Sequence, residues 1–171
     1  MTPLLRMRKL FLLANLLLGV PAAWADESRT RDFFAAISGE WQGSGETLGM
    51  ASSQQARWEP ALDAAFFRFV FDNRMTATDG RESRFRAEAF YRVTADGAVT
   101  GTWLDSRGMT LPLTGIVDAT GALTIEWGSP ETERGRSSYR LIGGALEVTD
   151  EVMNPDGSWR VFGRTVLQRK P

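Results

Sequence analysis

Two aspartates interrupt otherwise apolar alternating patterns, and their positions suggest site chemistry. Asp105 follows Trp103 on the same face of its segment, and Asp150 interrupts the face that carries Val148 and Val152. A carboxylate that points into a protein interior is costly unless it is paired or hydrated. Each aspartate therefore indicates a polar cavity that holds water, an arginine or a ligand. The alternative is that both carboxylates lie at the rims of the fold, in solvent.

Aromatic residues share the inward-facing positions with the two aspartates. Large rings with a few polar groups among them are the usual composition of a small-molecule pocket. The same rings could instead fill the interior as an ordinary core. The candidate ligand-binding residues are Phe67, Phe69, Trp103, Asp105, Trp127, Tyr139 and Asp150.

Two residue types that dominate enzyme and metal sites are missing. The sequence has no histidine and no cysteine. This excludes a Ser-His-Asp triad, a thiol nucleophile, and zinc or haem held by histidine. We assign no catalytic residue, no metal site and no cofactor. An enzyme would have to work with carboxylates, and no paired spacing identifies such a site.

Ten segments of alternating hydrophobicity would position these side chains. Short turns separate them, so neighbours in sequence should pair antiparallel. A helix from Ser28 to Ile37 is expected in front of them. The resulting fold is an all-β, up-and-down antiparallel barrel, and a barrel of ten strands is wider than its side chains tend to fill. The segments are 39–48, 54–59, 65–75, 83–93, 98–105, 109–117, 122–128, 136–142, 145–153 and 158–170.

The first 25 residues have the pattern of a secretory signal peptide. Basic residues precede an apolar run from Leu10 to Val20, and Ala23-Trp24-Ala25 predicts cleavage before Asp26. The apolar run is too short for a permanent membrane anchor. We therefore expect a periplasmic or secreted protein with one domain, residues 26–171.

The charge balance of that domain gives no reason to expect a nucleic-acid partner. Without the three basic residues Arg6, Arg8 and Lys9, the chain keeps 17 Lys and Arg against 21 Asp and Glu. The two signs are interspersed along the sequence. Nucleic-acid binding requires a basic patch, which this pattern lacks.

The stretch from Gly39 to Gly45, GEWQGSG, is expected to form a special first strand. Trp41 is expected to be buried as a plug at one end of the barrel. Gly43 and Gly45 follow on the same face. Glycine is tolerated in a strand where the strand bends or where another group packs against its backbone.

This stretch resembles the G-x-W opening of the calycin barrels, and is most similar to nitrobindin-like barrels and exported bacterial domains. The resemblance implies an arginine near the end of the last strand that packs across Trp41. Arg169 is the first candidate and Arg164 the second. Calycins bind haem, fatty acids, retinoids or other small apolar molecules. Nitrobindins hold haem iron through a histidine, so that activity does not transfer to this chain.

We therefore expect an exported carrier or sensor that holds a small apolar molecule inside the barrel. One alternative is a structural or interaction module without a ligand. The other is a carboxylate-based lyase or isomerase that works in the barrel cavity.

Overall fold

The computed structural model describes residues 22–171, and their side chains from residue 27 onward. Helix α1 (Ala22–Ile37) begins six residues before the expected start and ends where the sequence predicts. Most of the predicted signal peptide, residues 1–21, lies outside the described residues, so export stays a prediction. No helix among the described residues is long and apolar enough to cross a membrane.

Ten antiparallel strands follow α1 and close into a single barrel. Each strand pairs with its neighbours in sequence, and β1 closes the ring by pairing with β10. This confirms the predicted up-and-down barrel with a short N-terminal helix. The strands are β1 (Gly39–Thr47), β2 (Met50–Ala61), β3 (Phe66–Thr76), β4 (Glu82–Val93), β5 (Val99–Asp105), β6 (Thr110–Val117), β7 (Leu123–Gly128), β8 (Arg134–Ile142), β9 (Ala145–Met153) and β10 (Trp159–Arg169).

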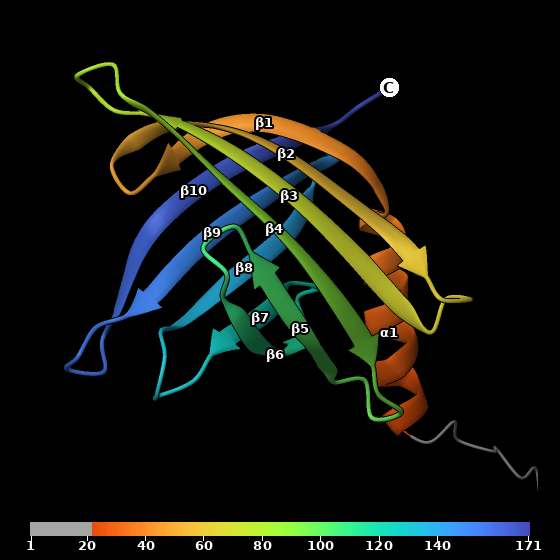
Figure 1. Cartoon of the computed structure of the whole chain (residues 1–171). Coiled ribbons are helices and arrows are strands. Elements are labelled where there is room, and N and C mark those ends of the chain that lie inside the picture. Colours follow the sequence, from red (N-terminus) through yellow and green to blue (C-terminus); the bar gives the residue numbers. More distant parts are fainter. Residues whose placement is uncertain (1–21) are drawn as a thin grey trace, which may run out of the picture.

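Helix α1 covers one end of the barrel. Figure 1 shows it lying across the ends of β2, β3 and β4. Phe34 and Ile37 on its inner face are completely buried. The hydroxyl of Thr30 donates a hydrogen bond to the carbonyl oxygen of Gly97 in the turn between β4 and β5, at 2.7 Å. The helix is thus fixed both by apolar burial and by a buried polar contact.

Trp41 connects the helix to the first and last strands. Its indole is buried, and Nε1 donates to the carbonyl oxygen of Ile37 at 2.7 Å. The Arg169 guanidinium lies over the indole, 4.4 Å from the ring centroid. The same guanidinium donates to the carbonyl oxygens of Ala36 and Ser38 at the end of α1. One arginine therefore satisfies helix carbonyls and stacks on the tryptophan, the contact that the calycin resemblance implies.

Gly43 and Gly45 lie where the β10 backbone leaves no room for a side chain on β1. A Cβ at Gly43 would overlap the carbonyl oxygen of Val166, and a Cβ at Gly45 would overlap that of Arg164. Neither position can take a side chain without moving the β10 backbone. This close approach permits the sharp coiling that closes the barrel at the β1 and β10 seam.

The strand β10 contains a bulge that changes which of its residues face inward. Val161 pairs with Glu151 and Gly163 pairs with Asp150, which leaves Phe162 as an extra residue. Alternation carried back along the strand from Leu167 and Thr165 would place Val161 and Trp159 on the inward face, but the bulge prevents this. Because one extra residue reverses the alternation, Phe162 faces the interior instead. Trp159 stacks under the guanidinium of Arg136, 4.4 Å from its ring centroid.

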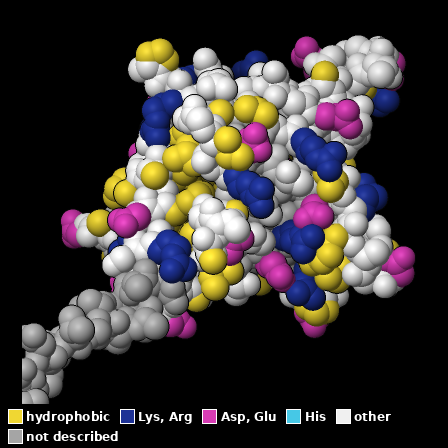
Figure 2. Space-filling view, turned by 180° about the vertical axis from the view of Figure 1, so that it is seen from behind, with side chains coloured by type: hydrophobic (Ala, Val, Ile, Leu, Met, Phe, Trp, Pro, Cys, Tyr) yellow, Lys and Arg dark blue, Asp and Glu magenta, His cyan; other side chains and the backbone are white. Residues whose placement is uncertain are grey.

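Charged side chains of both signs are spread over the outer surface. Figure 2 shows Lys and Arg interspersed with Asp and Glu on one face, with hydrophobic side chains between them. Several of these charges form cross-strand pairs, such as Arg68 with Glu59 and Glu88. Such exposed pairs contribute little stability individually.

Candidate ligand-binding site

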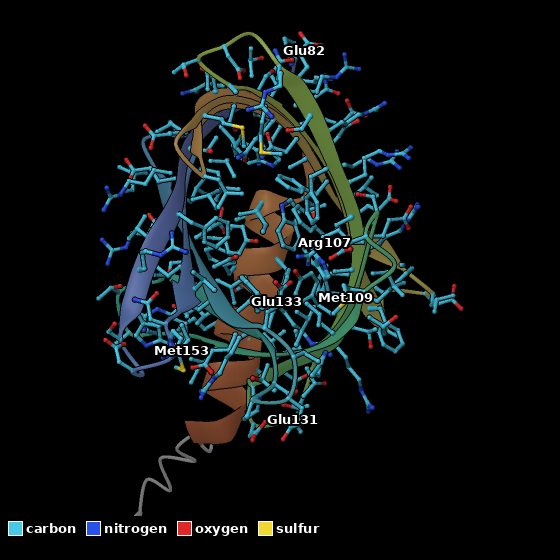
Figure 3. The ribbon with its side chains drawn as sticks, turned by 60° about the vertical axis from the view of Figure 1, so that its left-hand side comes forward. Glu82, Arg107, Met109, Glu131, Glu133 and Met153 are labelled. Carbon is cyan, nitrogen blue, oxygen red and sulfur yellow. The ribbon has the colours of Figure 1, made fainter. Side chains whose placement is uncertain are left out.

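A cavity of about 420 Å³ occupies the half of the barrel away from α1. Its outermost lining residues, Leu48, Arg107 and Glu133, lie in the turns at the end opposite the helix. Figure 3 looks into this end of the barrel, with α1 visible behind the ring of strands. The volume lies within the range of about 300 to 1,000 Å³ that is typical of ligand pockets.

One wall of the cavity is a continuous row of aromatic rings from β3, β4 and β5. Phe69 stacks near Phe71, with ring centroids 5.8 Å apart, and Phe71 meets Phe85 at 6.3 Å. Trp103 lies 6.3 Å from both Phe69 and Phe85. We call these four residues, Phe69, Phe71, Phe85 and Trp103, the aromatic wall. Their centroid spacings are those of packed aromatic pairs, and all four residues line the cavity.

Trp58, Tyr91 and Tyr139 form the boundary between the cavity and the filled end. Trp58 stacks on Phe69 at 4.1 Å and meets Tyr139 edge to face at 5.5 Å. Burial raises the pKa of both tyrosines, so their hydroxyls stay neutral. The Trp58 indole Nε1 is buried and lacks a hydrogen-bond partner among the described residues. The inner boundary of the cavity is therefore made of aromatic rings, and its polar groups, two hydroxyls and one indole N–H, are uncharged.

Asp150 places a carboxyl group on the cavity side opposite the aromatic wall. Its Oδ1 accepts a hydrogen bond from the Ser137 hydroxyl at 2.6 Å. The described residues offer no donor to Oδ2 and no ion pair to this carboxylate. Burial raises the pKa of Asp150 to about 6, and the Ser137 hydrogen bond opposes part of this shift. The group is therefore a mixture of acid and carboxylate near pH 6 and mainly a carboxylate at neutral pH.

A second polar group on the cavity lining comes from β1, β2 and β3. The Gln54 Nε2 donates to the hydroxyls of Thr47 and Ser52, at 3.4 and 3.2 Å. Asn73 accepts from Ser52 at 3.0 Å and donates to Thr47 at 3.2 Å. These four buried side chains satisfy one another, which is how uncharged polar groups persist in an interior. They give the cavity a polar surface without net charge.

Arg107 links two turns at the mouth of the cavity. Its guanidinium donates to Asp105 at 2.7 Å and also forms an ion pair with Glu133 in the turn between β7 and β8. Figure 3 shows Arg107 and Glu133 at the open end, inside the ring of strands. Arg107 also lies over the Phe85 ring, 5.4 Å from its centroid. The mouth is thus bordered by one cation held between two carboxylates.

Asp105 is the buried base of this arrangement. Its side chain is 0% exposed and also accepts from the Trp103 indole Nε1 at 3.2 Å. Burial acts to raise its pKa, but the bonds from Arg107 and Trp103 outweigh that effect and hold the pKa below its usual value. Asp105 is therefore a permanent carboxylate that positions Arg107 and Trp103.

Five of the seven sequence-predicted ligand residues line the cavity, and two do not. Phe67 lies outside the lining because it stacks on Phe34 of α1, with ring centroids 4.6 Å apart. Asp105 lies outside because Arg107 covers it. The five that line the cavity are Phe69, Trp103, Trp127, Tyr139 and Asp150. Trp127 has space only because its neighbour on β8 is Gly135, where a Cβ would overlap the indole.

Several lining residues were absent from the sequence-based set. Gln54 and Asn73 could have been found by continuing the alternation of their strands through Trp58 and Phe69. Phe162 and Arg160 could not, because the bulge reverses the β10 pattern. Arg107 lies in a turn, where alternation carries no information about direction.

The assembled site is a cavity with few groups that could carry out a reaction. Among the described residues, no group of three or more Asp or Glu side chains is placed to hold a metal ion. Asp150 is the one lining group whose pKa the structure shifts toward neutrality from its usual acidic value. The cavity has room for a small molecule and holds, in Asp150, a carboxyl group suited to proton transfer near neutral pH.

Comparisons with known proteins agree with the barrel and add no activity. No protein-family model matches the chain, and no curated protein matches it. Among solved structures, the chain is similar to the crystal structure of Rv2717c from M. tuberculosis, with a TM-score of 0.61. The two sequences are 18% identical, and the match covers 89% of this chain and 99% of that chain. At this identity the likeness shows a shared barrel fold alone.

Proposed function

We propose that this protein is an exported, calycin-like carrier or sensor that holds a small, largely apolar molecule in the barrel. The observation that carries the proposal is the cavity of about 420 Å³ at one end, lined mainly by rings and a few polar groups. An interaction module without a ligand would not need an open interior. The predicted signal peptide supports a periplasmic or secreted location.

The direct test is native mass spectrometry of protein purified from the cell envelope, followed by extraction of whatever is bound. We expect a mass excess that disappears on denaturation, and a mature chain that begins at Asp26. Protein with no excess mass that also fails to take up apolar probes would contradict the carrier role. A mature chain that still begins at Met1 would contradict export.

A pair of matched variants locates the binding to the cavity. Val152 lines the cavity, and Val166 lies on the outer face of β10 with 48% of its surface exposed. Val152→Trp should fill the mouth and remove the bound mass, whereas Val166→Trp should leave it unchanged. Equal loss in both variants would show that the molecule binds elsewhere or that the barrel is perturbed.

The second candidate function is catalysis by Asp150, and its pKa of about 6 favours it. A carboxyl group poised near neutrality can act as a general acid or base. In that case Asp150→Asn would leave binding of the extracted molecule intact and abolish its turnover. If Asp150→Asn binds the molecule as the native protein does and the products are also unchanged, Asp150 is not catalytic.

A further inference from the structure

The charges inside the cavity are unbalanced. Asp150 lies on the cavity lining, whereas the lining cations, Arg107 and Arg160, come from the turn and the strand start at the mouth. Arg107 is already held by Asp105 and Glu133. Arg160 lies on the strand next to Asp150, but makes no ion pair within 4 Å among the described residues. The interior therefore presents a carboxylate that no protein cation neutralises.

The local packing leaves one oxygen of Asp150 free to accept a ligand donor. Ser137 on β8 occupies Oδ1. On the other side, Asp150 pairs with Gly163 of β10, where a Cβ would lie 3.0 Å from Oδ2 and 3.3 Å from the Asp150 Cβ. Glycine at this position gives the carboxyl group room, and the bulge beside it brings Phe162 to the cavity. Asp150 lines the cavity, and the described residues offer Oδ2 no hydrogen-bond donor.

The aromatic wall lies across the barrel from this carboxylate. In the strand order of the ring, β9 is five strands from β4 in either direction, and β3 and β5 flank β4. A flat molecule lying on the wall would direct a substituent toward Asp150. Aromatic faces also attract cations, so a positive charge in this cavity is favoured by the rings as well as by the carboxylate.

We propose that the molecule held in the cavity is a flat arylalkyl amine, with its ring on the aromatic wall and its protonated nitrogen on Asp150. This inference rests on the carrier function proposed above and specifies the ligand's chemical class. An anionic ligand would be repelled by Asp150, and the lining cations, Arg107 and Arg160, lie away from it at the mouth. A purely apolar ligand would leave the carboxylate desolvated, with the Ser137 hydroxyl on Oδ1 and no partner for Oδ2, which is costly.

Binding of such an amine should depend on pH in a defined direction. With a pKa of about 6 in the empty protein, Asp150 is charged above that pH and neutral below it. The facing tyrosines do not titrate in this range, because burial raises the pKa of both Tyr139 and Tyr91. Hydrogen bonds to Glu133 and Asp105 raise the pKa of Arg107, so it stays cationic. The other charged groups on the lining, Arg160 and Glu133, lie at the mouth. Affinity for an amine should therefore fall as the pH drops below about 6, while affinity for a neutral analogue should stay level.

The test compares three probes that share one ring system: 2-naphthylmethylamine, 2-naphthylmethanol and 2-naphthoic acid. Each is titrated into the mature protein and followed by quenching of the tryptophan fluorescence. At neutral pH we expect the amine to bind at least tenfold more tightly than the alcohol, and the acid to bind least. Asp150→Asn should abolish the preference for the amine while keeping affinity for the alcohol.

Arg160→Gln is the control for charge neutralisation by Arg160, the β10 arginine that lines the cavity. If Arg160 does not neutralise Asp150, this variant should keep the preference for the amine or increase it. A preference that exists only in Arg160→Gln would show that the native carboxylate is already paired, and would overturn the inference.

The remaining outcomes separate this inference from the carrier function. Equal binding of amine and alcohol by the native protein, or a preference that survives Asp150→Asn, would overturn the amine class and leave the carrier function standing. Failure of all three probes, together with no bound mass in envelope-purified protein, would overturn both. Circular dichroism of each variant checks that the barrel is intact.

Discussion

The two ends of this barrel use the same kind of residue for opposite purposes. At the helix end, Phe34 is completely buried, stacked on Phe67 at 4.6 Å and tilted against Trp58 and Tyr91 at 5.8 and 5.7 Å. At the open end, the rings of the aromatic wall contact one another along the barrel wall and border empty space. The sequence pattern of alternating rings is the same in both halves.

The difference between the ends comes from α1. A ten-stranded barrel is too wide for its own side chains to meet at the centre. At one end the helix supplies the missing side chains, including Phe34 and Ile37. Among residues 22–171, which the structure describes, no element does this at the other end, so the cavity begins where the helix contacts stop. The lesson is that a side chain's role in this barrel depends on its depth along the strand as well as on its face.

The largest expected effect comes from the same truncation made at both ends. Phe34→Ala should lower the free energy of unfolding by about 3 to 5 kcal/mol, because it leaves a cavity between the helix and several rings. Phe85→Ala should cost only about 1 kcal/mol, because that ring already borders the cavity and loses fewer contacts. Urea unfolding followed by circular dichroism measures both values. Equal costs would mean that the two ends are packed alike.

Much of the fold was predictable because alternation reports which face of a strand is buried. The pattern Phe67, Phe69, Phe71 identified both the strand and its inward side. Chain order then determined the topology, since short turns leave antiparallel neighbours as the simplest pairing. The bulge at Phe162 was not predictable, because an inserted residue leaves no mark in the alternation except an apparent mismatch.

The sequence predicted the kind of site, an aromatic cavity with a carboxylate, but only some of the residues that line it. Asp150 was identified because it breaks an apolar face, and the structure places it on the cavity lining. Phe67 and Phe69 could not be separated, since both face inward and only the helix distinguishes their depths. Asp105 was identified as inward, but its partner Arg107 lies in a turn, and turn residues carry no periodic signal.

The second expected effect concerns the buried charge in the open half. The pKa of Asp150 rises from 3.8 to about 6 on folding, so the folded state binds this proton more tightly than the unfolded state. The stabilisation from this group is present below about pH 4 and is lost as the pH rises to about 6. Burial of the charge should cost up to about 3 kcal/mol at neutral pH.

Asp150→Asn isolates this contribution because asparagine stays neutral at every pH. Relative to the native protein, the variant should gain stability between about pH 4 and about pH 6, up to about 3 kcal/mol. The groups with lowered pKa values, such as Asp105 and Asp72, have the opposite dependence but are common to both proteins and cancel. Unfolding free energies at several pH values give the difference. A flat difference would mean that Asp150 is well hydrated in the cavity.

The third expected effect tests the attachment of the helix to the barrel. Arg169→Lys should lower stability by about 1 to 2 kcal/mol, because lysine cannot both stack on Trp41 and donate to Ala36 and Ser38. Arg164→Lys is the control on the same strand, where Arg164 is exposed, and should change stability by less than about 0.5 kcal/mol. Thermal unfolding compares the two. If Arg164→Lys had the larger effect, Arg164 and not Arg169 would be the arginine that packs on Trp41.

The substitution with the smallest expected effect on stability should have the clearest effect on the rates at which a ligand enters and leaves the cavity. Glu133→Ala breaks the link from Arg107 to the turn between β7 and β8, and leaves the Arg107 pair with Asp105 in place. Because the link is partly exposed, its loss should cost less than about 1 kcal/mol. Entry and exit of 2-naphthylmethanol should both accelerate, since the turns at the mouth are no longer joined. Stopped-flow fluorescence measures the two rates, with Glu131→Ala in the same turn as the control.

High salt should weaken the Arg107–Glu133 ion pair in the native protein and shift its entry and exit rates toward those of the variant. Rates that match the native protein at every salt concentration would show that the mouth opens elsewhere.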